Sequence, residues 1–317
     1  MTDSSPARPR IRPLPKLRQL RYLIALDAWR HFGRAAEDCL VTQSTLSAGI
    51  QELEAVLGVT LVERTKRRVL MTPLGEEVVA KARALLRDAE DIVDLVEARQ
   101  PPLSGRLSLG AIPTIGPYVL PRALPALRRR YPDLQLFLRE DQTARLLAQL
   151  RGGDLDVALI ALPFDTGDLE TMPLAEDGLV VVCPSAHELA GHPAVEEDDL
   201  GDADLLMLED GHCLRDHALT TCRLGGGRGN EVFQATGMNT LLQMVAAGMG
   251  VTLLPGIAEP YERARSDGLS FVPLAGNPMA RQIALAWRRQ AVRAQDYRLL
   301  GEALAPFVQP QDRGADA

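Results

Sequence analysis

Apolar residues in the first 60 positions recur every three or four residues, which predicts amphipathic helices. Three helices are expected, over residues 17–30, 32–40 and 44–57, with a polar break at 41–43 before the third. The apolar stripe of the first helix is Leu20, Leu23, Ile24 and Ala28, and that of the third is Leu46, Ile50, Leu53 and Leu57. Gly58 is expected to end the third helix, because glycine readily adopts the left-handed conformation at a helix C-terminus.

The other face of the third helix starts with small polar side chains, which let a helix approach base edges in the major groove. Two short apolar runs follow within residues 59–75 and flank a cationic turn, so they predict a basic hairpin beside DNA phosphates. The expected DNA contacts are Thr42, Gln43, Ser44, Thr45, Ser47, Gln51, Arg64, Lys66, Arg67 and Arg68. The alternative is a small helical domain with a solvated basic loop.

Residues 76–100 contain neither glycine nor proline and predict one long helix. Its seam has the 3.5-residue period of a coiled coil and consists of Val78, Ala82, Leu85, Ala89, Ile92 and Val96. We expect dimerisation through this helix, which would set two recognition helices about 34 Å apart; packing within the chain is the alternative. Residues 99–105, RQPPLSG, break the helix and form a candidate linker.

Beyond residue 105 the chain alternates between strand and helix patterns. Strands are expected at 106–112, 134–141 and 155–162, with helices between them. A second set follows, including GLVVVCP at 178–184 and VTLLP at 251–255. Alternation at this spacing predicts parallel βαβ units in two α/β lobes with a cleft between them.

Composition narrows the class of protein. Residues 1–70 carry 12 Lys and Arg against 7 Asp and Glu, a net of +5, and the rest carry 23 against 35, a net of −12. A basic head on an acidic body suggests a nucleic-acid-binding module. The chain shows no membrane span, secretory signal, hydrolase elbow, phosphate loop or zinc-protease motif. We therefore expect a cytoplasmic protein that is not an enzyme and has no cofactor.

Two of the four cysteines lie in EDGHCLRDHALTTC, residues 209–222. A helix is expected from near Gly211, with Asp210 as its cap. If Cys213 and Cys222 both lay on it, they would be roughly 13.5 Å apart on opposite faces. A disulfide needs Cα atoms within about 7 Å, so the bridge and the intact helix exclude each other.

Reactivity is expected at Cys213, because a helix N-terminus, His212 and Arg215 favour the thiolate. Cys222 suits a resolving partner, and a thioredoxin- or glutaredoxin-type reductant would restore both thiols. Two alternatives stay open: inert packing cysteines, and a metal site using Cys213 and His217, for which no third ligand is evident. Cys39 and Cys183 are expected to be structural.

Residues 32–75 resemble the N-terminal winged helix of LysR-type transcriptional regulators, with Thr42-Gln43-Ser44 where that family usually has Ser-Gln-Pro. The resemblance implies a winged helix-turn-helix, a long dimerisation helix and a two-lobed α/β body similar to a periplasmic solute-binding protein. The expected domains are a tail at 1–14, the DNA-binding domain at 15–73, the linker helix at 74–102, the regulatory domain at 103–306 and a tail at 307–317.

Four further segments resemble the peroxide-sensing branch of that family: LGAIPTIGPYVLP, QTARLLAQL, LLMLEDGHCLRDHALTTC and MVAAGMGVTLLP. The resemblance implies that Cys213 is the peroxidatic cysteine and Cys222 the resolving one. It implies peroxide binding by Thr114, Thr143, His212, Arg215 and Asp216. The implied partners are promoter DNA, hydrogen peroxide, a second or fourth copy of the chain, and RNA polymerase.

The expected function is therefore a peroxide-sensing activator of transcription that switches by refolding residues around 211–230. Residues 223–230 depart from the pattern of that branch, so the switching threshold is where this chain is expected to differ. Two alternatives stay open. One is a LysR-type regulator gated by a small molecule in the cleft, and the other is a cysteine-dependent peroxidase.

Overall fold

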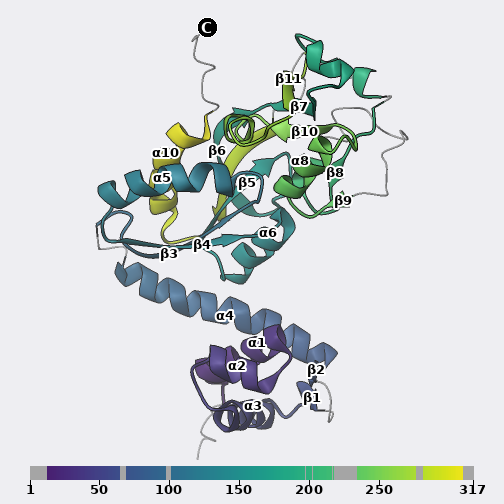
Figure 1. Ribbon diagram of the computed structural model, residues 1–317. Helices are drawn as coiled ribbons and strands as arrows, with labels where there is room; N and C mark the ends of the chain where they lie inside the picture. The colour runs from purple at the N-terminus through teal and green to yellow at the C-terminus, as the bar shows by residue number, and fades with distance from the viewer. Residues whose placement is uncertain are drawn as a thin grey trace, which may run out of the picture. The chain divides into compact units, whose positions relative to one another are not determined.

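Figure 1 shows the chain as a computed structural model. The structure describes residues 13–64, 69–97, 101–196, 198–201, 203–215, 217, 234–275 and 281–309. The chain divides into two compact units, Met1–Val93 and Asp94–Ala317. No helix in these ranges is long and apolar enough to cross a membrane.

The N-terminal unit has the helices that the apolar spacing predicted. Its elements are α1 (Leu17–Trp29), α2 (Phe32–Asp38), α3 (Gln43–Leu57), β1 (Val62–Arg64), β2 (Val69–Met71) and most of α4 (Pro73–Glu97). Leu46, Ile50 and Leu53 of α3 are fully buried, and Gly58 ends that helix with a φ of 72°. The apolar stripe predicted for α1 is wrong in part. Ala28 is exposed, and Tyr22 and Leu26 are buried instead.

Helix α4 buries one short stretch against the rest of its unit. Val79 and Ala82 are buried in the same hydrophobic core as α1 and α3. Farther along, Leu85, Ile92 and Val93 are 48%, 67% and 56% exposed. The apolar seam predicted from the sequence therefore continues along α4 beyond the part that packs on its own chain.

The C-terminal unit begins with a five-stranded sheet, which we call the first lobe together with its helices. Its elements are β3 (Gly105–Ala111), α5 (Gly116–Arg130), β4 (Leu134–Glu140), α6 (Thr143–Gly152), β5 (Val157–Leu162), β6 (Leu169–Asp177), β12 (Arg281–Arg288) and α10 (Ala294–Val308). The strand order is β4-β3-β5-β12-β6. Strands β4 and β5 lie parallel to β3, as predicted, whereas β12 is antiparallel to both of its neighbours.

The second lobe contains a three-stranded sheet of order β10-β7-β11 and a two-stranded pair, β8 and β9. Its elements are β7 (Leu179–Pro184), the 3-10 turns Glu188–Gly191 and Asp198–Leu200, β8 (Met207–Leu208), β9 (Gln234–Ala235), α8 (Met238–Ala246), β10 (Thr252–Pro255), α9 (Glu259–Arg263) and β11 (Leu269–Pro273). The parallel arrangement predicted for this lobe is wrong for the larger sheet, because β10 and β11 both pair antiparallel to β7.

The apolar runs explain which strands lie at the centre. Every residue of β7 from Leu179 to Cys183 is buried, as is every residue of β5 from Val157 to Ala161. Continuous apolar strands need cover on both faces, which helices such as α6 and α8 supply. Strand β4 lies at the edge of its sheet and is mostly exposed.

Candidate functional site

The carboxyl ends of three adjacent strands of the first lobe bring polar groups to one edge of the sheet. Residues 112–114 follow β3, residues 141–143 follow β4 and Pro163 follows β5. The sheet pairs Ala111 with Glu140 and with Leu159, so these ends lie side by side. Ligands of α/β proteins commonly bind outside the carboxyl ends of parallel strands. This edge carries Thr114 and Thr143, two of the predicted site residues.

Cys213 lies on a short helical stretch of the second lobe. Residues 213–215 and 217 are helical, and Cys213 is only 4% exposed. The helix begins two residues later than expected, and Asp210 does not cap it. The Asp210 carboxylate instead accepts from Arg215, with Oδ1 2.9 Å from Nε. Gly211 has a φ of 94°, so the chain turns just before His212 and Cys213.

Two contacts tie the Cys213 segment to the strand ends of the first lobe. Gln142 Nε2 donates to the carbonyl oxygen of Asp210 at 3.4 Å. A Cβ at Gly211 would lie 2.9 Å from the side-chain oxygen of Gln142, so a larger residue would push this contact apart. On the other side of Cys213, His217 Nε2 lies 3.1 Å from the carbonyl oxygen of Pro163.

Thr143 carries a buried hydroxyl at this edge of the sheet. The residue is 1% exposed and follows Gln142 directly as the first residue of α6. Within the described part of the chain its Oγ1 has no hydrogen-bond partner. Because a buried hydroxyl without a partner is costly, this atom is suited to a small polar ligand or a water molecule.

The hydroxyl of Thr114 is held by Arg281. Arg281 Nη1 donates to Thr114 Oγ1 at 2.8 Å, and Nη2 donates to the Thr114 carbonyl oxygen at 3.0 Å. Arg281 is itself 1% exposed and pairs with the fully buried Asp177 at 2.8 Å. Asp177 also accepts from the backbone N–H of Ile257 at 2.8 Å. These groups join the two lobes where the chain passes between them.

Sequence reasoning missed Arg281 and Asp177. The two residues are 104 positions apart, and each sits at the end of a strand. No local spacing could have paired them. Their burial follows from the return of β12 into the first sheet beside β6, a topology that the strand patterns did not predict.

His212 differs from the electrostatic role that we expected. Its side chain is 6% exposed, with Nε2 3.9 Å from Glu209 Oε1. Burial lowers the pKa of His212 from its ordinary value of 6.5, and the nearby Glu209 opposes this shift. The lowered pKa favours the neutral imidazole, which supplies less positive charge to a thiolate than we expected. Arg215 pairs with Asp210 and also donates to the Leu208 carbonyl oxygen at 3.4 Å.

Four other residues named from the sequence are Cys222, Asp216, Cys39 and Cys183. Cys222 and Asp216 lie outside the described residues. Cys39 ends α2 and is half-buried, whereas Cys183 is fully buried in β7. Burial raises the pKa of both of these thiols. Among the described residues, no group of three or more His, Cys, Asp or Glu side chains is placed to hold a metal ion.

Helix α3 presents the predicted polar face to solvent. Thr42 caps it, with Oγ1 accepting from the Thr45 backbone N–H at 3.3 Å. The residues of this face that are exposed are Thr42, Gln43, Ser44, Thr45 and Gln51, and Ser47 is half-buried. Arg64 ends β1, and Lys66, Arg67 and Arg68 lie outside the described residues.

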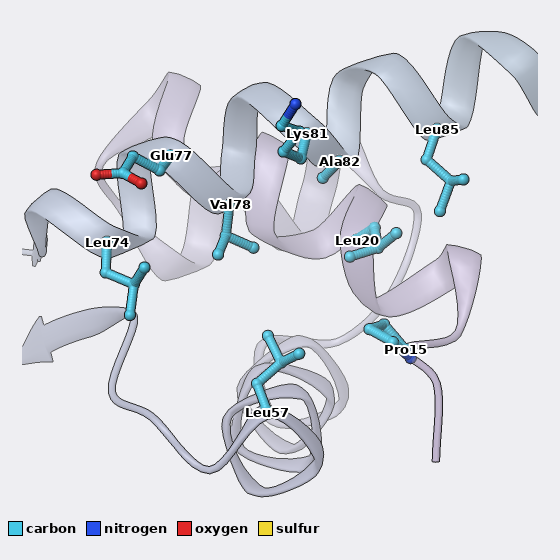
Figure 2. Close-up of a pocket in the computed structure, with 9 residues that line it drawn as sticks. All are labelled: Pro15, Leu20, Leu57, Leu74, Glu77, Val78, Lys81, Ala82 and Leu85. Carbon is cyan, nitrogen blue, oxygen red and sulfur yellow. The ribbon is translucent and has the colours of Figure 1, made fainter. Parts of the chain in front are cut away.

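An apolar groove of about 300 Å³ lies between α4 and the N-terminal helices. Figure 2 shows Val78, Ala82 and Leu85 of α4 along one side, with Leu20 and Leu57 facing them. Leu74, Glu77, Lys81 and Pro15 complete the lining. We call this surface, together with the exposed apolar residues of α4 beyond it, the α4 seam.

Two family models match the chain. Residues 17–76 match the bacterial regulatory helix-turn-helix protein, lysR family, and residues 100–308 match the LysR substrate binding domain. Both matches agree with the division into a helical N-terminal unit and a two-lobed α/β body.

Individual proteins match over most of their length. The HTH-type transcriptional regulator EstR of Acinetobacter baylyi is 43% identical over 276 residues, covering 87% of this chain and 91% of that protein. The DNA-binding transcriptional dual regulator OxyR of Escherichia coli is 42% identical over 288 residues, covering 91% and 94%. An H2O2-bound cysteine mutant of Corynebacterium glutamicum OxyR is 36% identical, covers 94% of each chain and has a TM-score of 0.64.

Proposed function

The chain belongs to the LysR family of bacterial transcriptional regulators, and we propose that it senses hydrogen peroxide through a reversible disulfide between Cys213 and Cys222. The observation that carries the proposal is the buried Cys213 turn, tied to strand ends that also carry the Thr143 hydroxyl, which has no partner among the described residues. Relatives named as OxyR or as hydrogen peroxide-inducible activators support this assignment.

The chemistry proceeds in two steps. The Cys213 thiolate attacks one peroxide oxygen, the O–O bond breaks, and the leaving hydroxide takes a proton to become water. The resulting sulfenic acid is attacked at sulfur by the Cys222 thiol, which forms the disulfide and releases a second water. In total, two thiols and one peroxide yield one disulfide and two waters. A thioredoxin- or glutaredoxin-type dithiol reverses the change.

The strand-end hydroxyls suit the first step. A guanidinium only donates, so Arg281 occupies an acceptor site of the Thr114 oxygen and leaves that hydroxyl proton able to donate to peroxide. Thr143 offers a second buried hydroxyl without a partner in the described chain. Neutral His212 can donate one proton or accept one. Such preorganised donors stabilise the charge that develops on the departing oxygen.

The signal then passes through a local refolding. Residues 213–215 are helical, and two cysteines nine positions apart on one continuous helix would face opposite sides. We propose that the bridge between Cys213 and Cys222 forms by opening the turn at Cys213. A covalent bond that forbids one conformer can supply the roughly 5.5 kcal/mol that reverses a 1:99 equilibrium.

The output is DNA binding by a homo-oligomer. The exposed polar start of α3 suits base edges, and the cations after β1 suit phosphates. The α4 seam is apolar, continuous and only partly covered by its own chain, so a second copy's α4 is its proposed occupant (Figure 2). We further infer that the protein works in the cytoplasm, dimeric or tetrameric, and activates promoters together with RNA polymerase.

A Cys213→Ser variant tests the proposal. On a promoter fragment that the reduced wild type binds, the variant should bind DNA but show no change on adding peroxide. Cys183→Ser, in the buried strand β7, is the control and should respond as wild type does. A Cys213→Ser protein that still responds would favour the alternative of a regulator gated by a small molecule. Sustained peroxide turnover would favour a peroxidase.

A further inference from the structure

His217 lies four residues after Cys213 and is buried, with 7% of its surface exposed. Residues four apart on a helix share one face, so the imidazole projects from the same side of the turn as the Cys213 thiol. Its Nε2 lies 3.1 Å from the carbonyl oxygen of Pro163. A carbonyl oxygen only accepts hydrogen bonds, so Nε2 carries the proton and donates.

The acceptor is attached to a rigid part of the first lobe. Pro163 follows β5, whose residues from Val157 to Ala161 are fully buried. Strand β5 pairs with β3 on one side and with β12 on the other. The bond therefore links the Cys213 turn to the end of β5 in the five-stranded sheet, across 54 positions of sequence.

We propose that His217 is a positioning residue that fastens the Cys213 turn to the first lobe in the dithiol form and thereby sets the equilibrium between dithiol and disulfide. The inference rests on the proposed Cys213–Cys222 switch. Because the turn opens when the disulfide forms, the bond to Pro163 exists in the dithiol form and is lost in the disulfide. A contact made in one state shifts the equilibrium toward that state.

A second tie on the other side of Cys213 is weaker. Gln142 reaches the Asp210 carbonyl oxygen at 3.4 Å, near the limit for a hydrogen bond, and Asp210 is exposed. The bond of His217 is shorter, and its imidazole is buried. Loss of His217 should therefore release the C-terminal side of the turn while the N-terminal side stays tethered.

The first experiment measures the thiol–disulfide equilibrium of the full-length protein in glutathione redox buffers. His217→Ala should shift this equilibrium about fivefold toward the disulfide, which for a two-electron couple makes the potential about 20 mV more negative. His217→Gln should restore the wild-type value, because its amide nitrogen is as many bonds from Cα as Nε2 is. His217→Asn is one bond too short and should behave like alanine. His192→Ala, at an exposed histidine, is the control.

The second experiment needs no oxidation. Hydrogen exchange of the fully reduced proteins should be faster in peptides covering residues 204–217 of the alanine and asparagine variants, and unchanged in the glutamine variant. Equal behaviour of His217→Ala and wild type in both experiments would overturn the proposal, as would equal shifts for His217→Ala and His217→Gln. If wild type formed no disulfide with peroxide, the proposed sensor would fail, and the exchange data alone would decide the role of His217.

Discussion

Arg281 holds Thr114 by both of its oxygens, with Nη1 2.8 Å from Oγ1 and Nη2 3.0 Å from the carbonyl oxygen. The same guanidinium is paired with Asp177, and all three side chains are buried. One side chain therefore orients a hydroxyl at the strand ends and joins the segments that connect the two lobes. Under the proposed function, Arg281 would therefore couple the stability of the fold to the reaction with peroxide.

Removing Arg281 should lower both the stability of the fold and the rate of reaction with peroxide. Arg281→Ala leaves the Asp177 carboxylate buried without its cation, so the free energy of unfolding should fall by about 3–5 kcal/mol. Urea denaturation followed by circular dichroism measures this change. Arg298→Ala is the control, because its pair with Glu170 is partly exposed and should contribute less than about 1 kcal/mol. Similar losses of stability in the two variants would contradict the stabilising role assigned to the buried pair of Arg281 and Asp177.

Thr143→Val should slow the reaction with peroxide without lowering the free energy of unfolding. The substitution removes a buried hydroxyl that has no partner in the described chain, so the free energy of unfolding should stay within about 0.5 kcal/mol or rise. The second-order rate constant for oxidation by peroxide should fall at least about tenfold, within the range that one proton donor contributes. Stopped-flow measurement of thiol loss gives this rate.

Thr252→Val is the matched control for Thr143→Val. Thr252 is equally buried, but its Oγ1 donates to the Leu206 carbonyl oxygen at 2.8 Å. This variant should lose about 1–3 kcal/mol of stability, while its rate of oxidation changes little. If Thr143→Val instead reacted with peroxide at the wild-type rate, the assignment of Thr143 to the peroxide site would be wrong.

The helices of the N-terminal unit were predictable because their patterns are local. Leu46, Ile50 and Leu53 showed the helical spacing, and Gly58 marked the end. The apolar strands β5 and β7 were predicted for the same reason. The order of strands in the second lobe was not, because antiparallel pairing of β10 with β7 depends on contacts across about 70 residues that leave no local trace.

The candidate site was predictable only in part. The cysteine segment was visible from spacing and resemblance, whereas Thr114 and Thr143 were named from the resemblance alone. The neutral state of His212 depends on burial that no spacing reveals. Asp210 was expected to cap a helix, but its carboxylate instead pairs with Arg215 at 2.9 Å. The bond from His217 to Pro163 likewise appears only in the folded chain.

The lowered pKa of His212 gives stability a defined dependence on pH. The unfolded state binds a proton near pH 6.5, whereas the folded state resists protonation until a lower pH. The stabilising contribution is therefore complete above about pH 6.5 and is lost as the pH falls below it. Urea denaturation between pH 7.5 and 5.5 should show a smaller loss of stability in His212→Asn than in wild type. His192→Gln, at an exposed site, should follow wild type; a His212→Asn profile identical to wild type would contradict the assignment.

The α4 seam is the proposed interface between two copies of the chain. Leu85→Asp and Ile92→Asp place a charge on exposed apolar positions of α4, so each should shift the protein toward smaller species without loss of helix content. Sedimentation velocity measures the association state. Val292→Asp, at an exposed apolar position outside α4, is the control. Wild-type association of both α4 variants would place the interface elsewhere.

The central claim is that Cys213 and Cys222 form a disulfide when the protein meets peroxide. Titration of accessible thiols in denatured protein, before and after one equivalent of hydrogen peroxide, tests it most directly. The wild-type chain has four cysteines and should fall to two thiols, with the lost pair mapped by mass spectrometry to Cys213 and Cys222. A count that stays at four, or a loss that maps to Cys39 or Cys183, would contradict it.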